Sequence, residues 1–301
     1  MRLASLHAAL VFAVATAASA VIIDSGDGTG NTTAPVPDPG WNNIGPRGTT
    51  TGVYLGGRFV LVAHHNGPGN ITLGGVTYVY VPGTAVQLDN GDGTYADLLM
   101  FQIHPAPPLP ALPIASQSPS VGTLLLMVGN GRDRGPAISF DPNGPQPPDP
   151  VDGYEWGAEQ HLRWGTNSVV DTPLVGLIDN SQTWTQTWGL QTVFDEAGSA
   201  HEAQAAVGDS GGPAFTWNGS QWQLAGILFA VGAPYANQPS GTALYGNLTF
   251  AADLSHYRNQ ILEVMLPEPD GGLWAGIAAV AILVRRRRAS NQRRSRSSTR
   301  R

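Results

Sequence analysis

The sequence of 301 residues contains no cysteine and no lysine. Without cysteine there is neither a disulfide bond nor a thiolate metal site, so a folded domain depends on its core alone. Acidic residues lie close together with glycine at 24–27 and at 89–92, but neither segment forms a complete oxygen-ligand loop for calcium. We therefore expect plain turns at both places, and neither a metal ion nor a cofactor.

Positive charge is scarce in most of the chain. Nine of the 16 arginines lie at or after Arg285, whereas residues 21–266 carry 20 acidic side chains and six arginines. Because a protein needs a basic surface to bind nucleic acid, this acidic body argues against a nucleic-acid partner.

Helical patterns are also scarce, while glycine (38 residues) and proline (24 residues) are abundant. Short β-rich runs separated by turn residues are typical of barrels and sandwiches. The proline-rich segment 105–113 predicts a connector between two such parts. One amphipathic helix is expected over Asp253–Met265, capped by Asp253 or Ser255. We expect strands at 51–57, 58–64, 76–81, 96–103, 123–128, 160–164, 183–192, 214–217 and 221–231, and polar loops at 129–135 and 141–152.

The N-terminal end carries an export pattern. Residues 1–20 combine Arg2, an apolar run and the small residues Ala18-Ser19-Ala20. This pattern predicts a secretory signal peptide that is cleaved after Ala20. Residues 21–40 are rich in Asp, Gly, Thr and Pro, and are expected to form a linker or a short pro-segment.

At the other end, Pro267-Glu268-Pro269 precedes an apolar run over 273–284 and four arginines at 285–288. This arrangement over residues 267–301 resembles the bacterial PEP-CTERM sorting signal. The resemblance implies an exosortase-type processing enzyme and a place in the bacterial cell envelope or on the extracellular surface. The chain would then reach the membrane only through this segment. A simple C-terminal membrane anchor, transient or permanent, is the alternative.

The segment Gly208–Pro213 reads Gly-Asp-Ser-Gly-Gly-Pro. Glycines on both sides of Ser210 allow a tight turn that exposes a hydroxyl and directs backbone N–H groups at a developing oxyanion. The segment resembles the nucleophile motif of the trypsin-like, chymotrypsin-fold serine proteases. The resemblance implies that Ser210 is the nucleophile, and that the N–H groups of Gly208 and Ser210 form the oxyanion hole.

Two further segments resemble the same family. Val60-Leu61-Val62-Ala63-His64-His65 matches the strand end that carries the general base, which implies His65 for that role. His64 replaces a small residue of the pattern and is a rival base. Asp97-Leu98-Leu99-Met100 matches the strand that opens with the orienting acid, which implies Asp97. The order His65, Asp97, Ser210 is the order of the family.

The resemblance implies an all-β fold of two six-stranded antiparallel β-barrels of the chymotrypsin type, with a C-terminal helix. The first barrel is expected in residues 41–115, and the second barrel with the helix in residues 116–266. The implied activity is that of an exported serine endopeptidase that hydrolyses peptide bonds through an acyl-enzyme, with protein or peptide as substrate.

Substrate preference depends on two segments. Gln204, six residues before the nucleophile, corresponds to the base of the primary substrate pocket of the family. Because Gln204 is not acidic, we do not expect a preference for Lys or Arg. Phe229-Ala230-Val231 departs from the Ser-Trp-Gly of the family, which binds substrate backbone. A catalytically decayed scaffold that only binds, in the envelope or matrix, is therefore the alternative function.

Asp209, next to the nucleophile, is expected to be buried and to need a partner. In many relatives a freshly cut apolar N-terminus pairs with this acid. Ile44-Gly45 is a faint candidate for such a start, and Arg132, Arg134 and Arg163 are the arginine candidates. The residues alone do not rank them.

The nucleophile segment also fits two other hydrolase patterns. It matches Gly-x-Ser-x-Gly of the α/β-hydrolases, but the scarcity of helices before Asp253 argues against that fold. Gly208-Asp209-Ser210 and Asp253-Leu254-Ser255-His256 look like the end motifs of the GDS-type lipases and esterases. Only 43 residues separate Ser210 from Asp253, too few for the domain that lies between those motifs.

Overall fold

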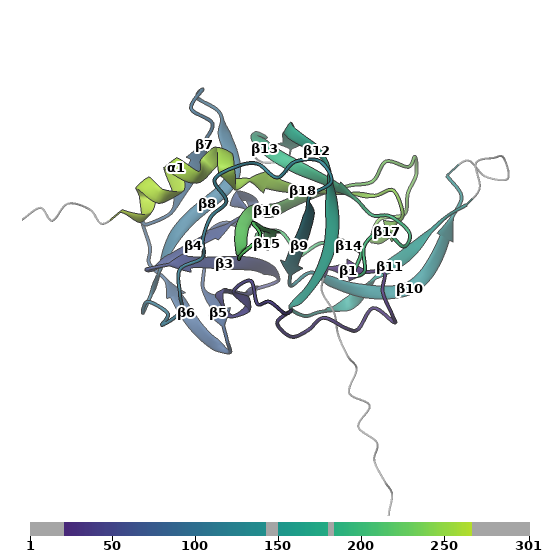
Figure 1. The fold of residues 1–301 in the computed structure, drawn as a ribbon, viewed down its shortest axis with the longest axis horizontal. Coiled ribbons are helices and arrows are strands. Elements are labelled where there is room, and N and C mark those ends of the chain that lie inside the picture. The colour runs from purple at the N-terminus through teal and green to yellow at the C-terminus, as the bar shows by residue number, and fades with distance from the viewer. Residues whose placement is uncertain (1–20, 143–149, 180–183, 267–301) are drawn as a thin grey trace, which may run out of the picture. The chain divides into compact units, whose positions relative to one another are not determined.

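The computed structural model describes residues 21–142, 150–179 and 184–266, and Figure 1 shows how their strands are arranged. The predicted signal peptide at 1–20 and the predicted sorting segment at 267–301 lie outside the described residues. Within the described ranges, no helix has the length and apolar content that a membrane crossing requires.

The first part of the fold is an antiparallel sheet that curls into a barrel. Its strands are β2 (Ile44–Arg47), β3 (Thr50–Gly56), β4 (Phe59–Val62), β5 (Ile71–Leu73), β6 (Val76–Tyr80), β7 (Val86–Asp89) and β8 (Tyr95–His104). Six strands pair in the order β2-β3-β4-β8-β6-β5, and β7 pairs with β8 beside this path. Gly45 of β2 lies directly against the carbonyl oxygen of Thr72 in β5, where a side chain would collide. Glycine therefore allows the two end strands to approach each other.

The second part is a closed barrel of six antiparallel strands in the order β12-β13-β18-β16-β15-β9. Its strands are β9 (Leu124–Gly129), β12 (Arg163–Asp179), β13 (Trp184–Val193), β15 (Pro213–Trp217), β16 (Trp222–Gly232) and β18 (Leu248–Asp253). Its core is built from apolar residues that include Leu125, Met127, Val169, Leu190, Leu228 and Ala251. Together the two parts confirm the predicted all-β architecture of two antiparallel barrels.

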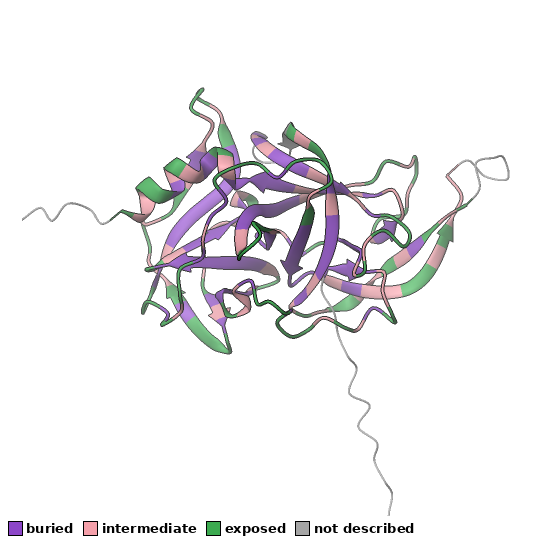
Figure 2. Cartoon of the chain, viewed as in Figure 1, coloured by how far each residue is buried: buried purple, intermediate pink, exposed green. Residues whose placement is uncertain are grey.

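A separate three-stranded sheet joins β10 (Arg132–Phe140), β11 (Val151–Gln160) and β17 (Thr242–Leu244). The prediction of a polar loop at 129–135 was wrong, because β10 begins at Arg132. Most side chains of β10 and β11 are half-buried or exposed, as the pink and green of Figure 2 show. These strands therefore lack the apolar alternation by which a half-buried strand is recognised in a sequence.

The predicted C-terminal helix is α1 (Leu254–Met265). Of the two candidate caps, Asp253 takes the role: its Oδ1 accepts a hydrogen bond of 2.9 Å from the backbone N–H of Ser255. Tyr257, buried on the inner face of the helix, donates its hydroxyl to Asn90 of the first barrel (2.7 Å). The same hydroxyl accepts from the backbone N–H of Trp188 in the second barrel (2.9 Å). The first turns of the helix thus tie the two barrels together.

The first described residues are part of the core. Val21, Ile22 and Ile23 have exposed fractions of 0 to 1%. Ile22 and Ile23 form β1, which pairs with β14 (Ala203–Gln204). We expected a linker or pro-segment from residue 21 onward, whereas the structure packs residues 21–23 into the protein core.

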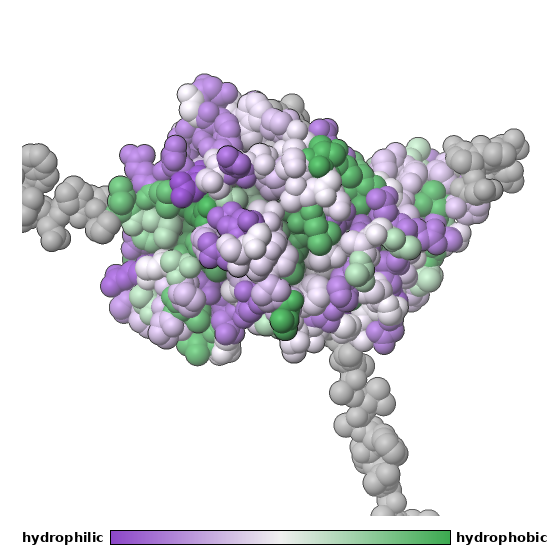
Figure 3. Space-filling view, viewed as in Figure 1, coloured by the Kyte–Doolittle hydropathy of each residue, from purple (hydrophilic) through white to green (hydrophobic). Residues whose placement is uncertain are grey.

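On the viewed face of the molecule, exposed apolar residues form only separate patches (Figure 3).

Candidate active site

His65 and Asp97 lie close together where the paired strands β4 and β8 end their shared register. In the register of β4 and β8, Val62 pairs with Leu99, so the residues after Val62 run alongside those before Leu99. The chain after β4 forms the short 3-10 helix η2 (His64–Asn66). The pairing therefore carries the ring of His65 to the carboxylate of Asp97.

The contact between these two side chains is close and doubly hydrogen-bonded. Nδ1 of His65 lies 2.6 Å from Oδ2 of Asp97, and the backbone N–H of His65 donates to Oδ1 at 2.9 Å. Asp97 is completely buried, whereas the His65 side chain is 24% exposed. A buried carboxylate on Nδ1 fixes the ring orientation and leaves Nε2 on the exposed side of the ring.

His64, the rival base, does not reach this acid. Its Nδ1 is buried and has no hydrogen-bond partner within the described residues. Gly67, with φ of +65°, ends η2 immediately after Asn66. The structure therefore brings His65, rather than His64, to Asp97.

Ser210 lies on the turn between β14 and β15, where two glycines have positive φ. These are Gly208 (φ +104°) and Gly211 (φ +88°). A side chain at Gly208 would lie 2.5 Å from Nε2 of Gln160 and 2.8 Å from the carbonyl oxygen of Thr49. The turn therefore requires glycine both for its backbone angles and for its close packing.

Some backbone N–H groups of this turn donate hydrogen bonds within the protein and others do not. Those of Asp209, Gly211 and Gly212 donate to carbonyl oxygens at 2.8 to 3.1 Å. Within the described residues, the N–H groups of Gly208 and Ser210 donate to no protein acceptor. Two unused donors on either side of Asp209 are what an oxyanion hole requires.

Residues of the first barrel hold this turn of the second barrel in place. Thr51 of β3, fully buried, donates its backbone N–H to the carbonyl oxygen of Ser210 (3.1 Å) and its hydroxyl to that of Gly208 (2.9 Å). Asn66 Nδ2, one residue after His65, donates to the same Ser210 oxygen at 2.8 Å. These bonds place Ser210 beside the segment that carries His65. Within the described residues, no hydrogen bond joins Ser210 Oγ to the His65 ring.

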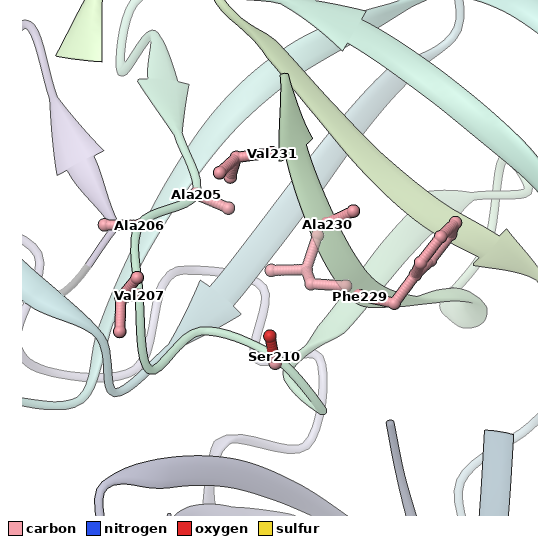
Figure 4. Close-up of a pocket in the computed structure, with 8 residues that line it drawn as sticks. Ala205, Ala206, Val207, Ser210, Phe229, Ala230 and Val231 are labelled. Carbon is pink, nitrogen blue, oxygen red and sulfur yellow. The ribbon is translucent and has the colours of Figure 1, made fainter. Parts of the chain in front are cut away.

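An apolar cavity of about 130 Å³ opens next to Ser210. Figure 4 shows Ala205, Ala206 and Val207 on one wall, and Phe229, Ala230 and Val231 of β16 on the other. The eighth residue of the lining is Leu228, and none of the eight is charged. Because an unpaired charge is costly to bury, the cavity suits a small apolar group.

Gln204, the residue we assigned to the base of this pocket, is not part of the lining. It is 1% exposed within β14, and its Oε1 has no hydrogen-bond partner among the described residues. Its neighbour Ala205 lines the cavity instead. A role of Gln204 in substrate binding stays a prediction.

Asp209 lies completely buried behind the turn. Its carboxylate accepts hydrogen bonds from the backbone N–H groups of Gly131 (2.7 Å), Ala206 (2.7 Å) and Val21. Burial raises the pKa of Asp209 to about 7, since the charged form loses its hydration. Sequence analysis missed Val21, although the cleavage predicted after Ala20 places it at a new N-terminus.

The other candidate partners of Asp209 lie elsewhere. Ile44 is a buried residue of β2, and Arg132 donates to a carbonyl oxygen of β11. Arg134 donates to three carbonyl oxygens in the segment that follows Val21. Within the described residues, Asp209 has neither a hydrogen bond nor an ion pair with Arg132, Arg134 or Arg163.

The acidic segments expected to be plain turns have the contacts of such turns. Asp27 accepts from the backbone N–H and the hydroxyl of Thr29, and Asp92 makes the same two bonds to Thr94. Across the described ranges, no group of three or more His, Asp or Glu side chains is arranged to hold a metal ion.

No protein-family profile and no curated protein sequence matches this chain. Among solved structures, neuropsin, a serine protease expressed in the limbic system of mouse brain, is similar with a TM-score of 0.50 and 18% identity. The match covers 79% of this chain and 99% of neuropsin. The likeness to neuropsin shows that the chain has the chymotrypsin-like fold of the trypsin-like serine proteases.

Two structures of another protease are also similar. An inactive form of Rv3671c from M. tuberculosis has a TM-score of 0.45 and 14% identity over 79% of this chain and 94% of its own. A second inactive form of Rv3671c has a TM-score of 0.42 and 16% identity over 75% and 90% of the two chains.

Proposed function

We propose that this chain is a serine endopeptidase that hydrolyses peptide bonds through an acyl-enzyme. The observation that supports this most strongly is the pair of His65 and the fully buried Asp97, beside a Ser210 turn with two unused N–H donors. A base, its orienting acid, a nucleophile and an oxyanion site are the groups that acyl transfer needs.

In the proposed reaction, Ser210 Oγ bonds to the scissile carbonyl carbon while Nε2 of His65 takes the hydroxyl proton. Asp97, bonded to Nδ1, stabilises the imidazolium that results. The unused N–H groups of Gly208 and Ser210 stabilise the negative oxygen. The imidazolium then protonates the leaving amine as the C–N bond breaks, and water releases the acyl group by the same steps in reverse order.

The cavity beside Ser210 supports a preference for a small apolar side chain before the scissile bond. The residues that line it include Ala205, Ala230 and Val231, and the branched side chain of Val231 points toward Ala205 (Figure 4). No charged residue lines it, so Lys, Arg, Asp or Glu would enter without a partner. Alanine and valine are the substrate residues that fit this lining.

The test is labelling by a fluorophosphonate probe, which reacts with activated serines. We would compare the processed protein with its Ser210→Ala and His65→Ala variants, each verified to be folded by circular dichroism. Labelling of the parent alone is the expected result. A folded, processed parent that is not labelled would favour the alternative of a decayed scaffold that only binds.

We extend the proposal to the place where the enzyme works. The signal-peptide pattern of residues 1–20 supports export, and the pattern of 267–301 supports sorting by an exosortase-type enzyme to the cell envelope. Mass spectrometry of the protein from a PEP-CTERM-sorting bacterium would test this, since processing removes the mass of both segments.

A further inference from the structure

The proposed base and the proposed nucleophile belong to different barrels. His65 lies in η2, which follows β4 of the first barrel, and Ser210 lies on the turn that precedes β15 of the second barrel. The chain has no cysteine, so no disulfide bond fixes the separation of these two segments. Because proton transfer requires the two groups to come within hydrogen-bonding distance, non-covalent contacts must set this separation.

One side chain bridges the two segments. Asn66, which directly follows His65, donates its Nδ2 to the carbonyl oxygen of Ser210 at 2.8 Å. The backbone N–H of Thr51 in β3 donates to the same oxygen at 3.1 Å. Both donors come from the first barrel, but only Asn66 is adjacent to the base. The amide of Asn66 therefore links the residue after the base to the residue that carries the nucleophile.

The backbone of Asn66 is held on both sides of its side chain. Its N–H donates to the carbonyl oxygen of Ala63 at 3.1 Å, and its own carbonyl oxygen accepts Nη2 (2.9 Å) and Nη1 (3.3 Å) of Arg47. The Arg47 guanidinium lies over the ring of Phe101, 5.9 Å from the centroid. Phe101 is a buried residue of β8, the strand that also carries Asp97. The amide of Asn66 is therefore directed at Ser210 from a backbone that is held in place.

The other groups of the proposed site do not fix this separation. Two hydrogen bonds hold His65 to Asp97, but both are made within the first barrel. Within the described residues, no hydrogen bond joins the His65 ring to Ser210 Oγ. The residues that line the apolar cavity lie at 205–210 and 228–231, all in the part of the chain that forms the second barrel (Figure 4). The cavity thus forms without the first barrel, whereas the alignment of the base needs a contact between the barrels.

We propose that Asn66 is a positioning residue that sets the distance between the His65 ring and Ser210 Oγ. It touches neither the substrate nor the reacting atoms, and it acts through the base. Loss of its amide would leave the cavity unchanged but would let η2 move relative to the turn, so kcat should fall while KM stays the same. This inference rests on the proposed function, because it takes Ser210 as the nucleophile and His65 as its base.

The experiment substitutes Asn66 in the processed protein in two ways. Asn66→Ala removes the side chain beyond Cβ, and Asn66→Leu keeps a side chain of similar size and shape without a donor. The assay is hydrolysis of a chromogenic peptide anilide with alanine before the scissile bond. We expect both variants to lower kcat about 100-fold, the cost of a displacement of about 1 Å in such a site, and to change KM by less than about 2-fold. A kcat within about 3-fold of the parent value in both folded variants would overturn the proposal.

Asn31→Ala is the matched control. Asn31 is half-buried like Asn66, and it donates its Nδ2 to a distant carbonyl oxygen, that of Trp164, at 2.9 Å. Its φ of +61° favours asparagine over alanine, so Asn31→Ala should lower stability at least as much as Asn66→Ala does. We expect each variant to lower the unfolding temperature by at least about 2 °C, and only Asn66→Ala to lower kcat. An equal loss of kcat in both variants would refute the positioning role.

A double-substitution cycle tests whether Asn66 acts through the base. The substrate is a p-nitrophenyl ester, whose leaving group needs no proton from His65. In His65→Ala, adding Asn66→Ala should change the residual rate by less than about 2-fold, because no base is then left to position. The same fold loss with and without His65 would overturn the proposal, because Asn66 would then act on Ser210 alone.

Hydrogen exchange gives a measure that does not depend on catalysis. The backbone N–H groups of His65, Asn66 and Gly67 donate hydrogen bonds to Asp97 or within their own segment. We expect these amides to exchange at least about 5-fold faster in Asn66→Ala than in the parent, and at the parent rate in Asn31→Ala. Unchanged exchange in Asn66→Ala would overturn the proposal. Faster exchange there, with a parent that hydrolyses neither substrate, would support the contact between the barrels and refute the proposed endopeptidase function.

Discussion

The pair of His65 and Asp97 gives a prediction whose size follows from its geometry. Asp97 is fully buried and accepts two hydrogen bonds from His65, one from Nδ1 at 2.6 Å and one from the backbone N–H at 2.9 Å. Asparagine has the same shape but only one acceptor oxygen. In Asp97→Asn, the amide group must face one of the two donors. If it faces Nδ1, the ring takes the other tautomer, with its proton on Nε2, where the proton of Ser210 must arrive.

We expect this substitution to lower kcat by about 10⁴-fold, the size that loss of the correct tautomer produces in such an arrangement. At about 1.4 kcal/mol for each factor of ten, the loss corresponds to about 5.5 kcal/mol of transition-state stabilisation. The assay is hydrolysis of a chromogenic peptide anilide with alanine before the scissile bond. Thermal unfolding of the same samples would show that the variant is folded.

The matched control is Asp92→Asn, which makes the same replacement of one carboxylate oxygen by an NH2 group at an exposed turn before Asp97. It should leave kcat within a factor of two. A folded Asp97→Asn protein with more than a tenth of the parent kcat would refute the role that we assign to Asp97.

Four other expectations follow from the same region. Val231→Gly removes a branched side chain from the cavity lining and should make room for a larger substrate side chain. We expect kcat/KM for a peptide with phenylalanine before the scissile bond to rise about 10-fold relative to kcat/KM for the same peptide with alanine. Thr51→Val removes the hydroxyl bond to Gly208 and should lower stability by about 1–2 kcal/mol and reduce kcat, as measured by urea unfolding and peptide hydrolysis. Gly211→Ala should lower the stability more than Gly219→Ala does. Both glycines have positive φ, but only Gly211 lies against the carbonyl oxygen of Thr51, and thermal unfolding of the two variants would show the difference. In a chain that keeps residue 20, burial and the nearby charge of Asp133 raise the pKa of Asp209 from 3.8 to about 7. The folded state then holds this proton more tightly, so the associated stability is complete below pH 3.8 and is lost as the pH rises to about 7. The loss is about 4 kcal/mol at most, and urea unfolding at both pH values should show that Asp209→Asn abolishes it.

Short motifs carried most of what the sequence revealed about the candidate site. His65, Asp97 and Ser210 each sit in a run of four to six residues whose chemistry is local: an apolar strand end, an acid that opens a strand, a glycine-flanked turn. The register that joins Val62 to Leu99 then follows from antiparallel pairing of two apolar strands. The helix over 254–265 was predictable for the same reason, since its buried residues repeat at helical spacing.

Exposed strands and distant contacts were beyond this reasoning. The first four residues of β10, 132–135, fall in the segment that was predicted as a polar loop, because most side chains of this strand are half-buried or exposed and form no apolar face. Thr51 reads as an ordinary strand residue, yet its N–H and hydroxyl hold the turn of Ser210 from the other barrel. Such contacts join residues more than 150 positions apart, and no local pattern records them.

The sequence by itself predicted the types and order of the proposed reacting groups, because each lies in a short motif whose backbone requirements are met by glycine or by the end of a strand. Only the tertiary structure decided which backbone N–H groups donate to the carboxylate of Asp209. From the sequence we considered three arginines and Ile44 as partners of Asp209. The pairing of β1 with β14 instead places the backbone N–H of Val21 within hydrogen-bonding distance of this carboxylate. The reason is physical: a buried carboxylate takes the donors that packing brings within 3 Å, and packing depends on the whole chain.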